Sequence, residues 1–174
     1  MRESFEQILT GGHPNSLGRT LEVVELILKD NTLVAELIET YSSSDEIVRL
    51  RVSNALKRIC KEHSDWVYPY TDILLSKIAK INQASTQWTL ATIFRLLSHF
   101  LTAEQKELAT DHLKHNLDTH KDWIVINTTM ETLFTWSKDN PLLAEWLIPR
   151  LQKFQKDTHK SISGRATKYL TALS

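Results

Sequence analysis

The feature that most constrains the fold is a spacing of 36 to 38 residues between apolar patterns of helical period. The segment VRLRVSNALKRI (48–59) places Leu56 and Ile59 on one face of a helix. A shift of 38 residues superposes Leu56 on Phe94, and a further shift of 36 superposes it on Met130. A unit of this length is a helical hairpin, which cannot bury its apolar face alone, so the spacing predicts stacked copies with Leu56, Phe94 and Met130 buried.

Helices of the same period are expected between these segments, and turn signals separate them. We therefore predict an all-α fold, an α-α superhelix (solenoid) of about five stacked helical hairpins in a single domain over residues 1–174. Asp45 and Ser85 are predicted helix N-caps, Thr102 and Gln105 a capping box, and Pro141 the first turn of a helix. The first helices of the hairpins are predicted at about Ser4–Thr10, Thr32–Tyr41, Pro69–Ile81, Ala103–Leu117 and Pro141–Lys156.

One segment carries a family resemblance in residue identity. In DEIVRLRVSNALKRI (45–59) an aspartate precedes a Val-Arg pair and a later Ala-Leu, and this segment resembles the second helix of a HEAT repeat. The helices that contain Pro69 and Pro149 resemble first helices of that family, which often carry an internal proline. The Val-Arg pair is missing from the later copies, so HEAT, armadillo and other helical-hairpin arrays all remain open. The resemblance implies a binding scaffold.

Composition excludes several classes of protein. Glycine and proline number four each, which favours long helices, and the formal net charge is zero, so no global field attracts nucleic acid or membrane. Cys60 is the single cysteine, which excludes an intramolecular disulfide, and we expect it to be buried. Neither a signal peptide nor a membrane span is expected, and these features together predict a cytoplasmic protein.

No pattern in the sequence predicts a reaction. His112 and His115 have a spacing that could share a metal, but no Asp/Glu-His signature of a known metal site surrounds them and Lys114 would repel the ion, so no metal site is predicted. The glycine-rich TGGHPNSLGR (10–19) lacks the Lys-Ser/Thr of a phosphate-binding loop. We therefore predict no enzyme activity, no catalytic residue and no cofactor.

The predicted binding surface is a polar strip along the second helices, which line the concave face of such arrays. On the 45–62 helix, Lys57 and Lys61 also lie on this polar side. Trp123 aligns with polar positions of other copies and is predicted to be partly exposed. The ordinary alternative is that the strip is only the solvated face of its helices. The binding ridge comprises Arg19, Arg51, Asn54, Arg58, Arg95 and His99.

Three functions are compatible with these sequence features. The first is a non-enzymatic scaffold that binds an acidic protein partner through the ridge. The second is a nucleic-acid backbone-binding protein of the kind related to alkylpurine DNA glycosylases, with Asp122 beside Trp123 as the local acid and aromatic; the acidic first third of the chain counts against it. The third is a subunit of a larger enzyme complex.

Overall fold

The computed structural model describes residues 2–174 and is all-α. Helix, 3-10 turns included, accounts for 77% of the described residues, which contain no strand, so the predicted all-α class is confirmed. Short 3-10 turns extend or join several helices, at Asn31–Leu33, Thr40–Ser42, Tyr68–Tyr70 and Ile78–Lys80. The α-helices are α1 (Phe5–Leu9), α2 (Thr20–Lys29), α3 (Val34–Glu39), α4 (Glu46–Glu62), α5 (Ser64–Val67), α6 (Thr71–Ser76), α7 (Ala84–Leu96), α8 (Ala103–Thr119), α9 (Trp123–Ser137), α10 (Pro141–Phe154) and α11 (Lys160–Leu173).

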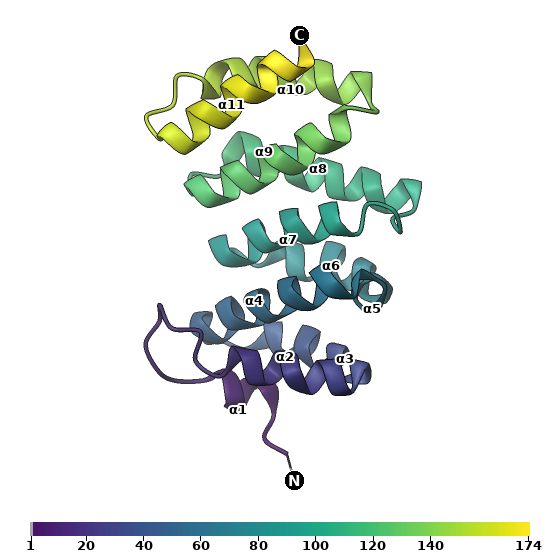
Figure 1. The fold of residues 1–174 in the computed structure, drawn as a ribbon, viewed down its shortest axis with the longest axis vertical. Coiled ribbons are helices and arrows are strands. Elements are labelled where there is room, and N and C mark those ends of the chain that lie inside the picture. Colours follow the sequence, from purple (N-terminus) through teal and green to yellow (C-terminus); the bar gives the residue numbers. More distant parts are fainter. Residues whose placement is uncertain (1) are drawn as a thin grey trace. The chain divides into compact units, whose positions relative to one another are not determined.

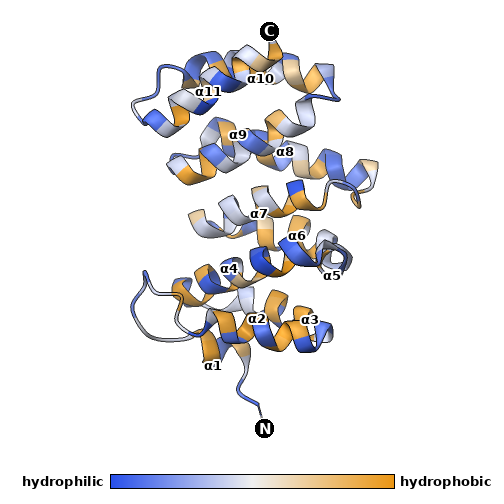
Figure 2. Cartoon of the chain, viewed as in Figure 1, coloured by the Kyte–Doolittle hydropathy of each residue, from blue (hydrophilic) through white to orange (hydrophobic). Residues whose placement is uncertain are grey.

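The chain divides into two compact units, Met1–Lys106 and Glu107–Ser174, with the boundary inside α8. Each unit has its own buried apolar residues. Figure 2 shows hydrophobic and hydrophilic segments alternating along most of the helices. A single domain over residues 1–174 stays a prediction.

In the first unit, α4 packs against α2 on one side and α7 on the other (Figure 1). Leu56 of α4 and Phe94 of α7 are fully buried, as their place in the repeat predicts. The buried hydroxyl of Tyr41 lies 2.8 Å from Oγ of Ser53, which satisfies both polar groups within the apolar interior. Cys60 is buried, and burial raises the pKa of its thiol to about 12, so the thiol is unreactive near neutral pH.

In the second unit, α9, α10 and α11 pack against one another, and Met130 is fully buried as predicted. The rings of Phe134 and Tyr169 stack with their centroids 3.9 Å apart. Arg150 of α10 lies 3.6 Å above the Trp146 ring and donates to both carboxylate oxygens of Asp118 at 2.7 and 2.9 Å. This hydrogen bonding lowers the pKa of Asp118 below its usual value.

Most of the predicted helix starts are correct. The Asp45 side chain accepts from the Ile47 N–H at 2.8 Å, Thr102 and Gln105 form the reciprocal capping box at 3.1 Å, and Pro141 begins α10. Ser85 is wrong as an N-cap, because it is the buried second residue of α7. Its hydroxyl instead accepts a hydrogen bond from Nε2 of Gln83, the residue that precedes the helix.

The predicted continuous helix over Pro69–Ile81 is also wrong. The segment begins as a 3-10 turn, forms α6, breaks at Lys77 (φ −115°, ψ −56°) and ends in a second 3-10 turn. Nε2 of Gln87, on α7, donates to the carbonyls of Ala79 and Ile81 at 3.0 and 2.8 Å. These bonds from outside the segment hold its last residues in a turn rather than in a continued helix.

A candidate binding groove on the first unit

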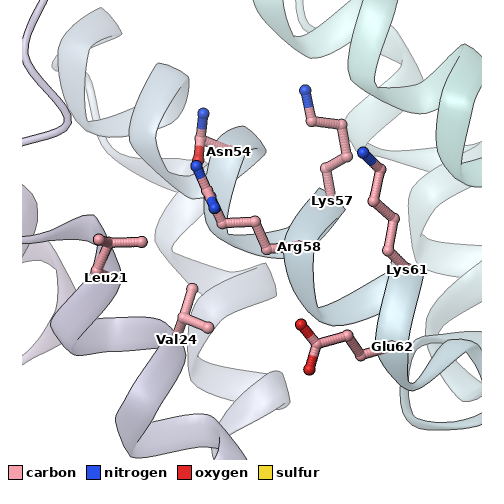
Figure 3. Close-up of a pocket in the computed structure, with 7 residues that line it drawn as sticks. All are labelled: Leu21, Val24, Asn54, Lys57, Arg58, Lys61 and Glu62. Carbon is pink, nitrogen blue, oxygen red and sulfur yellow. The ribbon is translucent and has the colours of Figure 1, made fainter.

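A hollow of about 310 Å³ lies between α2 and α4 (Figure 3). Its volume is at the small end for a ligand site and suits a few side chains of a partner better than a large cofactor. We call it the α2–α4 groove. Its lining residues are Leu21, Val24, Asn54, Lys57, Arg58, Lys61 and Glu62.

Three cationic side chains of α4 face this groove. Lys57, Arg58 and Lys61 form no ion pair within the part of the chain that the structure describes. The pKa of Lys57 lies below its ordinary value because the side chain is half-buried and because Lys61 and Arg58 repel its charge. Like charges one helical turn apart destabilise a helix by roughly 0.2–0.5 kcal/mol per pair. The cluster therefore has a small cost in the free protein, and a bound anion would relieve it.

Arg58 is positioned by its neighbour one turn earlier. Its Nε donates to Oδ1 of Asn54 at 2.8 Å, and Figure 3 shows the two side chains next to each other. The two terminal nitrogens of the guanidinium make no hydrogen bond with the described residues, so they are available for a carboxylate in the paired geometry that arginine favours.

The other wall of the groove is apolar. Leu21 of α2 is 49% exposed, and Val24 is half-buried one turn further along the helix. Leu17 and Leu28 are also exposed, so this short segment holds three of the eight exposed large apolar side chains in the described structure. An apolar wall facing a cationic wall is a surface that can bind an acidic and partly apolar segment.

The prediction that Arg51 lies on the exposed ridge is wrong. Arg51 is 2% exposed, and its guanidinium points into the loop between α1 and α2. It donates to the carbonyl of Leu9 at 2.6 Å and also to the carbonyls of Gly11, His13 and Ser16. Arginine suits this role because its five N–H donors spread around a plane and it stays charged. Arg51 thus holds a glycine-rich loop rather than a ligand.

Gly18 is required by this arrangement. Its backbone lies in the left-handed region at φ 53°, and a Cβ atom there would lie 2.9 Å from Cζ of Arg51. We expect Gly18→Ala to lower the free energy of unfolding by about 1–3 kcal/mol, from backbone strain and from displacement of Arg51.

A matched control for Gly18 lies in the interior of α11. A Cβ atom at Gly164 would meet nothing within 4 Å, so Gly164→Ala is expected to raise stability by about 0.5–1 kcal/mol. Chemical denaturation of the two variants measures both changes. Equal effects of the two substitutions would contradict the tight approach of Gly18 to Arg51.

The remaining predicted residues do not gather at one place. Arg19 precedes α2 and is engaged by Glu3 and Glu22, each at 2.8 Å, and these hydrogen bonds lower the pKa of both carboxyls. Arg95 on α7 is half-buried, and His99 is exposed beyond the end of that helix; neither lines the groove.

The structure confirms that Trp123, in the first turn of α9, is partly exposed, with 46% of its surface accessible. The adjacent carboxylate of Asp122 accepts from the N–H groups of Ile124 and Val125 at 2.9 and 3.0 Å. These bonds make Asp122 the N-cap of α9. The acidic residue that a glycosylase-like site would need therefore has a structural role here.

Of the predicted ridge, the groove therefore contains only Asn54 and Arg58. The polar pattern of α4 also indicated Lys57 and Lys61, whereas Leu21, Val24 and Glu62 were missed. The sequence signal for the apolar wall was the pair Leu21 and Leu28. These two apolar residues are two helical turns apart, on a different face of the helix from the buried Val23 and Ile27.

Within residues 2–174, no cluster of three or more His, Cys, Asp or Glu side chains is placed to bind a metal ion. No helix among the described residues combines the length and the apolar character that crossing a bilayer requires. No protein-family model matches the chain, and no curated protein matches it significantly.

Proposed function

We propose that the chain is a non-enzymatic binding module whose helices form a HEAT-like solenoid, and that the α2–α4 groove binds an acidic segment of a protein partner. The observation that carries the proposal is the cluster of Lys57, Arg58 and Lys61. These cations have no ion-pair partners in the described structure, and they face the same hollow as the exposed Leu21.

Two equivalent contacts support the repeat. Arg49 and Gln87 lie 38 residues apart, at matching positions of successive copies. Arg49 donates to the carbonyl of Ser43 at 2.6 Å, and Gln87 donates to that of Ile81 at 2.8 Å, each reaching back six residues. Arg49 also donates to Oε1 of Gln83 at 2.7 Å, which links α4 to the turn before α7. Side chains with the same role at the repeat spacing are expected of stacked hairpins.

A polypeptide suits the groove better than a nucleic-acid backbone. A phosphate backbone would favour a continuous cationic track, whereas Glu62 lines this groove and the facing wall is formed by Leu21 and Val24. An acidic protein segment can place carboxylates against α4 and apolar side chains against α2.

The experiment is a fluorescence-anisotropy titration with labelled poly-L-glutamate, repeated with labelled random-sequence duplex DNA. We expect poly-L-glutamate to bind and its affinity to fall as salt rises, since salt screens exposed charges. The double variant Lys57→Glu/Lys61→Glu is expected to weaken binding at least about tenfold, because two attractive charges become repulsive. Its unfolding midpoint should stay near that of the wild type, because the substitutions are at partly exposed positions.

The matched control is Lys156→Glu/Lys160→Glu, which makes the same change of charge at exposed positions in the second unit. If both double variants weaken binding equally, the effect is one of net charge and the groove is not the site. Tighter binding of duplex DNA than of poly-L-glutamate, lost in the Lys57→Glu/Lys61→Glu variant, would contradict the proposed protein partner.

A further inference from the structure

The two walls of the α2–α4 groove present different chemistry. On α2, Leu21 and Val24 line the groove, and Leu28, which lies outside its lining, continues the same face of the helix at the spacing i, i+3, i+7 over about 10 Å. On α4, Lys57 and Lys61 are one turn apart, with Arg58 beside them. An apolar row therefore lies next to a cationic row, and both repeat with the period of a helix.

A ligand complementary to both rows has an apolar stripe and an acidic stripe side by side at helical spacing. An extended strand would alternate its side chains to opposite faces every residue and could not place both stripes toward the groove. In an α-helix, apolar residues at i, i+3 and i+7 form one stripe, and carboxylates at i+1, i+4 and i+8 form the stripe beside it. Laying an amphipathic helix into a groove is an established mode of peptide recognition.

We infer that the occupant of the α2–α4 groove is an amphipathic α-helix of a partner protein, with leucine-type anchors against α2 and carboxylates against α4. This inference rests on the proposed function and specifies the form of the acidic segment. Arg58, held by Asn54, is placed to receive a carboxylate through its terminal nitrogens, while Lys57 and Lys61 contribute point charges.

The position of Glu62 predicts the orientation of a bound helix in the groove. It is the single acidic residue among the seven that line the groove, and Figure 3 shows its carboxylate at the opposite end from Asn54. A bound helix would therefore carry its carboxylates toward the Asn54 end and a neutral or basic residue at the Glu62 end.

The test uses the full chain and three synthetic peptides of about 18 residues, long enough to form a helix of roughly 27 Å when bound. The first has leucines at i, i+3, i+4 and i+7 with glutamates on the flanking positions. The second has the same composition in scrambled order, and the third replaces the leucines by serine. Binding is measured by anisotropy, and peptide helicity by circular dichroism.

We expect the first peptide to gain helicity on binding and to bind at least about tenfold more tightly than the scrambled peptide. That preference should disappear in Leu21→Ser/Leu28→Ser but persist in the control Leu142→Ser, which removes the most exposed apolar side chain, 77% accessible, from the second unit. Unfolding midpoints near that of the wild type confirm that these exposed positions are not structural.

Three other outcomes would contradict the bound helix, each in a different way. If the scrambled peptide binds as tightly as the first, the helical form is wrong while the acidic partner stands. If no peptide and no poly-L-glutamate binds, the proposed function fails together with this inference. If sedimentation shows self-association that Leu21→Ser abolishes, a second copy of the chain occupies the groove and the inference is overturned.

Discussion

Arg51→Leu is expected to lower the free energy of unfolding by about 3–5 kcal/mol. The guanidinium donates to four carbonyls and is 2% exposed, and hydrogen bonds to charged groups contribute roughly 1.5–3 kcal/mol each. The loss is smaller than the sum over four bonds, because the freed loop can rehydrate its carbonyls. Chemical denaturation measures the change, and hydrogen exchange should show the loop between α1 and α2 opening first.

The matched control for this substitution is on the same helix. Arg58 is exposed, so Arg58→Leu is expected to change stability by no more than about 0.5 kcal/mol. Arg51→Lys should lie between the two, since one ammonium group cannot reach four carbonyls arranged around a plane. Equal effects of Arg51→Leu and Arg58→Leu would show that the loop does not depend on the buried guanidinium.

Phe94→Ala is expected to have an effect of similar size, about 3–5 kcal/mol. Phe94 is fully buried, so its truncation removes apolar contacts and leaves a cavity that its neighbours fill only in part. The denaturant midpoint should fall, with little change in the secondary structure that remains below it.

Phe100 provides the corresponding exposed ring. It is 40% accessible and stacks on Tyr68 with the ring centroids 5.4 Å apart. Phe100→Ala should therefore cost only about 0.5–1.5 kcal/mol. A Phe94→Ala variant that unfolds at the wild-type midpoint would contradict the burial of this position.

The sequence contained most of the information for the helices because their apolar period is regular. Leu56, Phe94 and Met130 are equivalent by spacing and all three are buried. The cap at Asp45 was predictable because it depends on one side chain and a backbone N–H two residues away. Local rules failed over 69–81, where Gln87 supplies hydrogen bonds from a different helix.

The binding surface was less predictable than the helices. Helical period distinguishes the apolar side of a helix from its polar side, but it does not show which cations on the polar side are exposed and which are buried. Arg51 and Arg58 both lie off the apolar stripe of α4. Arg51 is buried because the loop at 10–19 folds over it, and that loop comes from a different part of the chain. The apolar wall was missed for a related reason, since the exposure of Leu21 depends on which other elements cover α2, and none of the described helices buries it.

The Arg51 anchor also affects the order in which the chain can fold during its synthesis. The bond from Arg51 to the carbonyl of Leu9 spans 42 residues, so the first loop has no anchor until α4 has been made. At a synthesis rate of roughly 5–20 residues per second, that interval lasts about 2 to 8 s. Ile27 is made 24 residues before Arg51, so for about 1 to 5 s of that interval Val23 and Ile27, which are fully buried in the finished protein, have no complete α4 to pack against. The ribosome-bound chain therefore presents α2 without its partner helix for seconds before Arg51, which anchors the loop between α1 and α2, emerges.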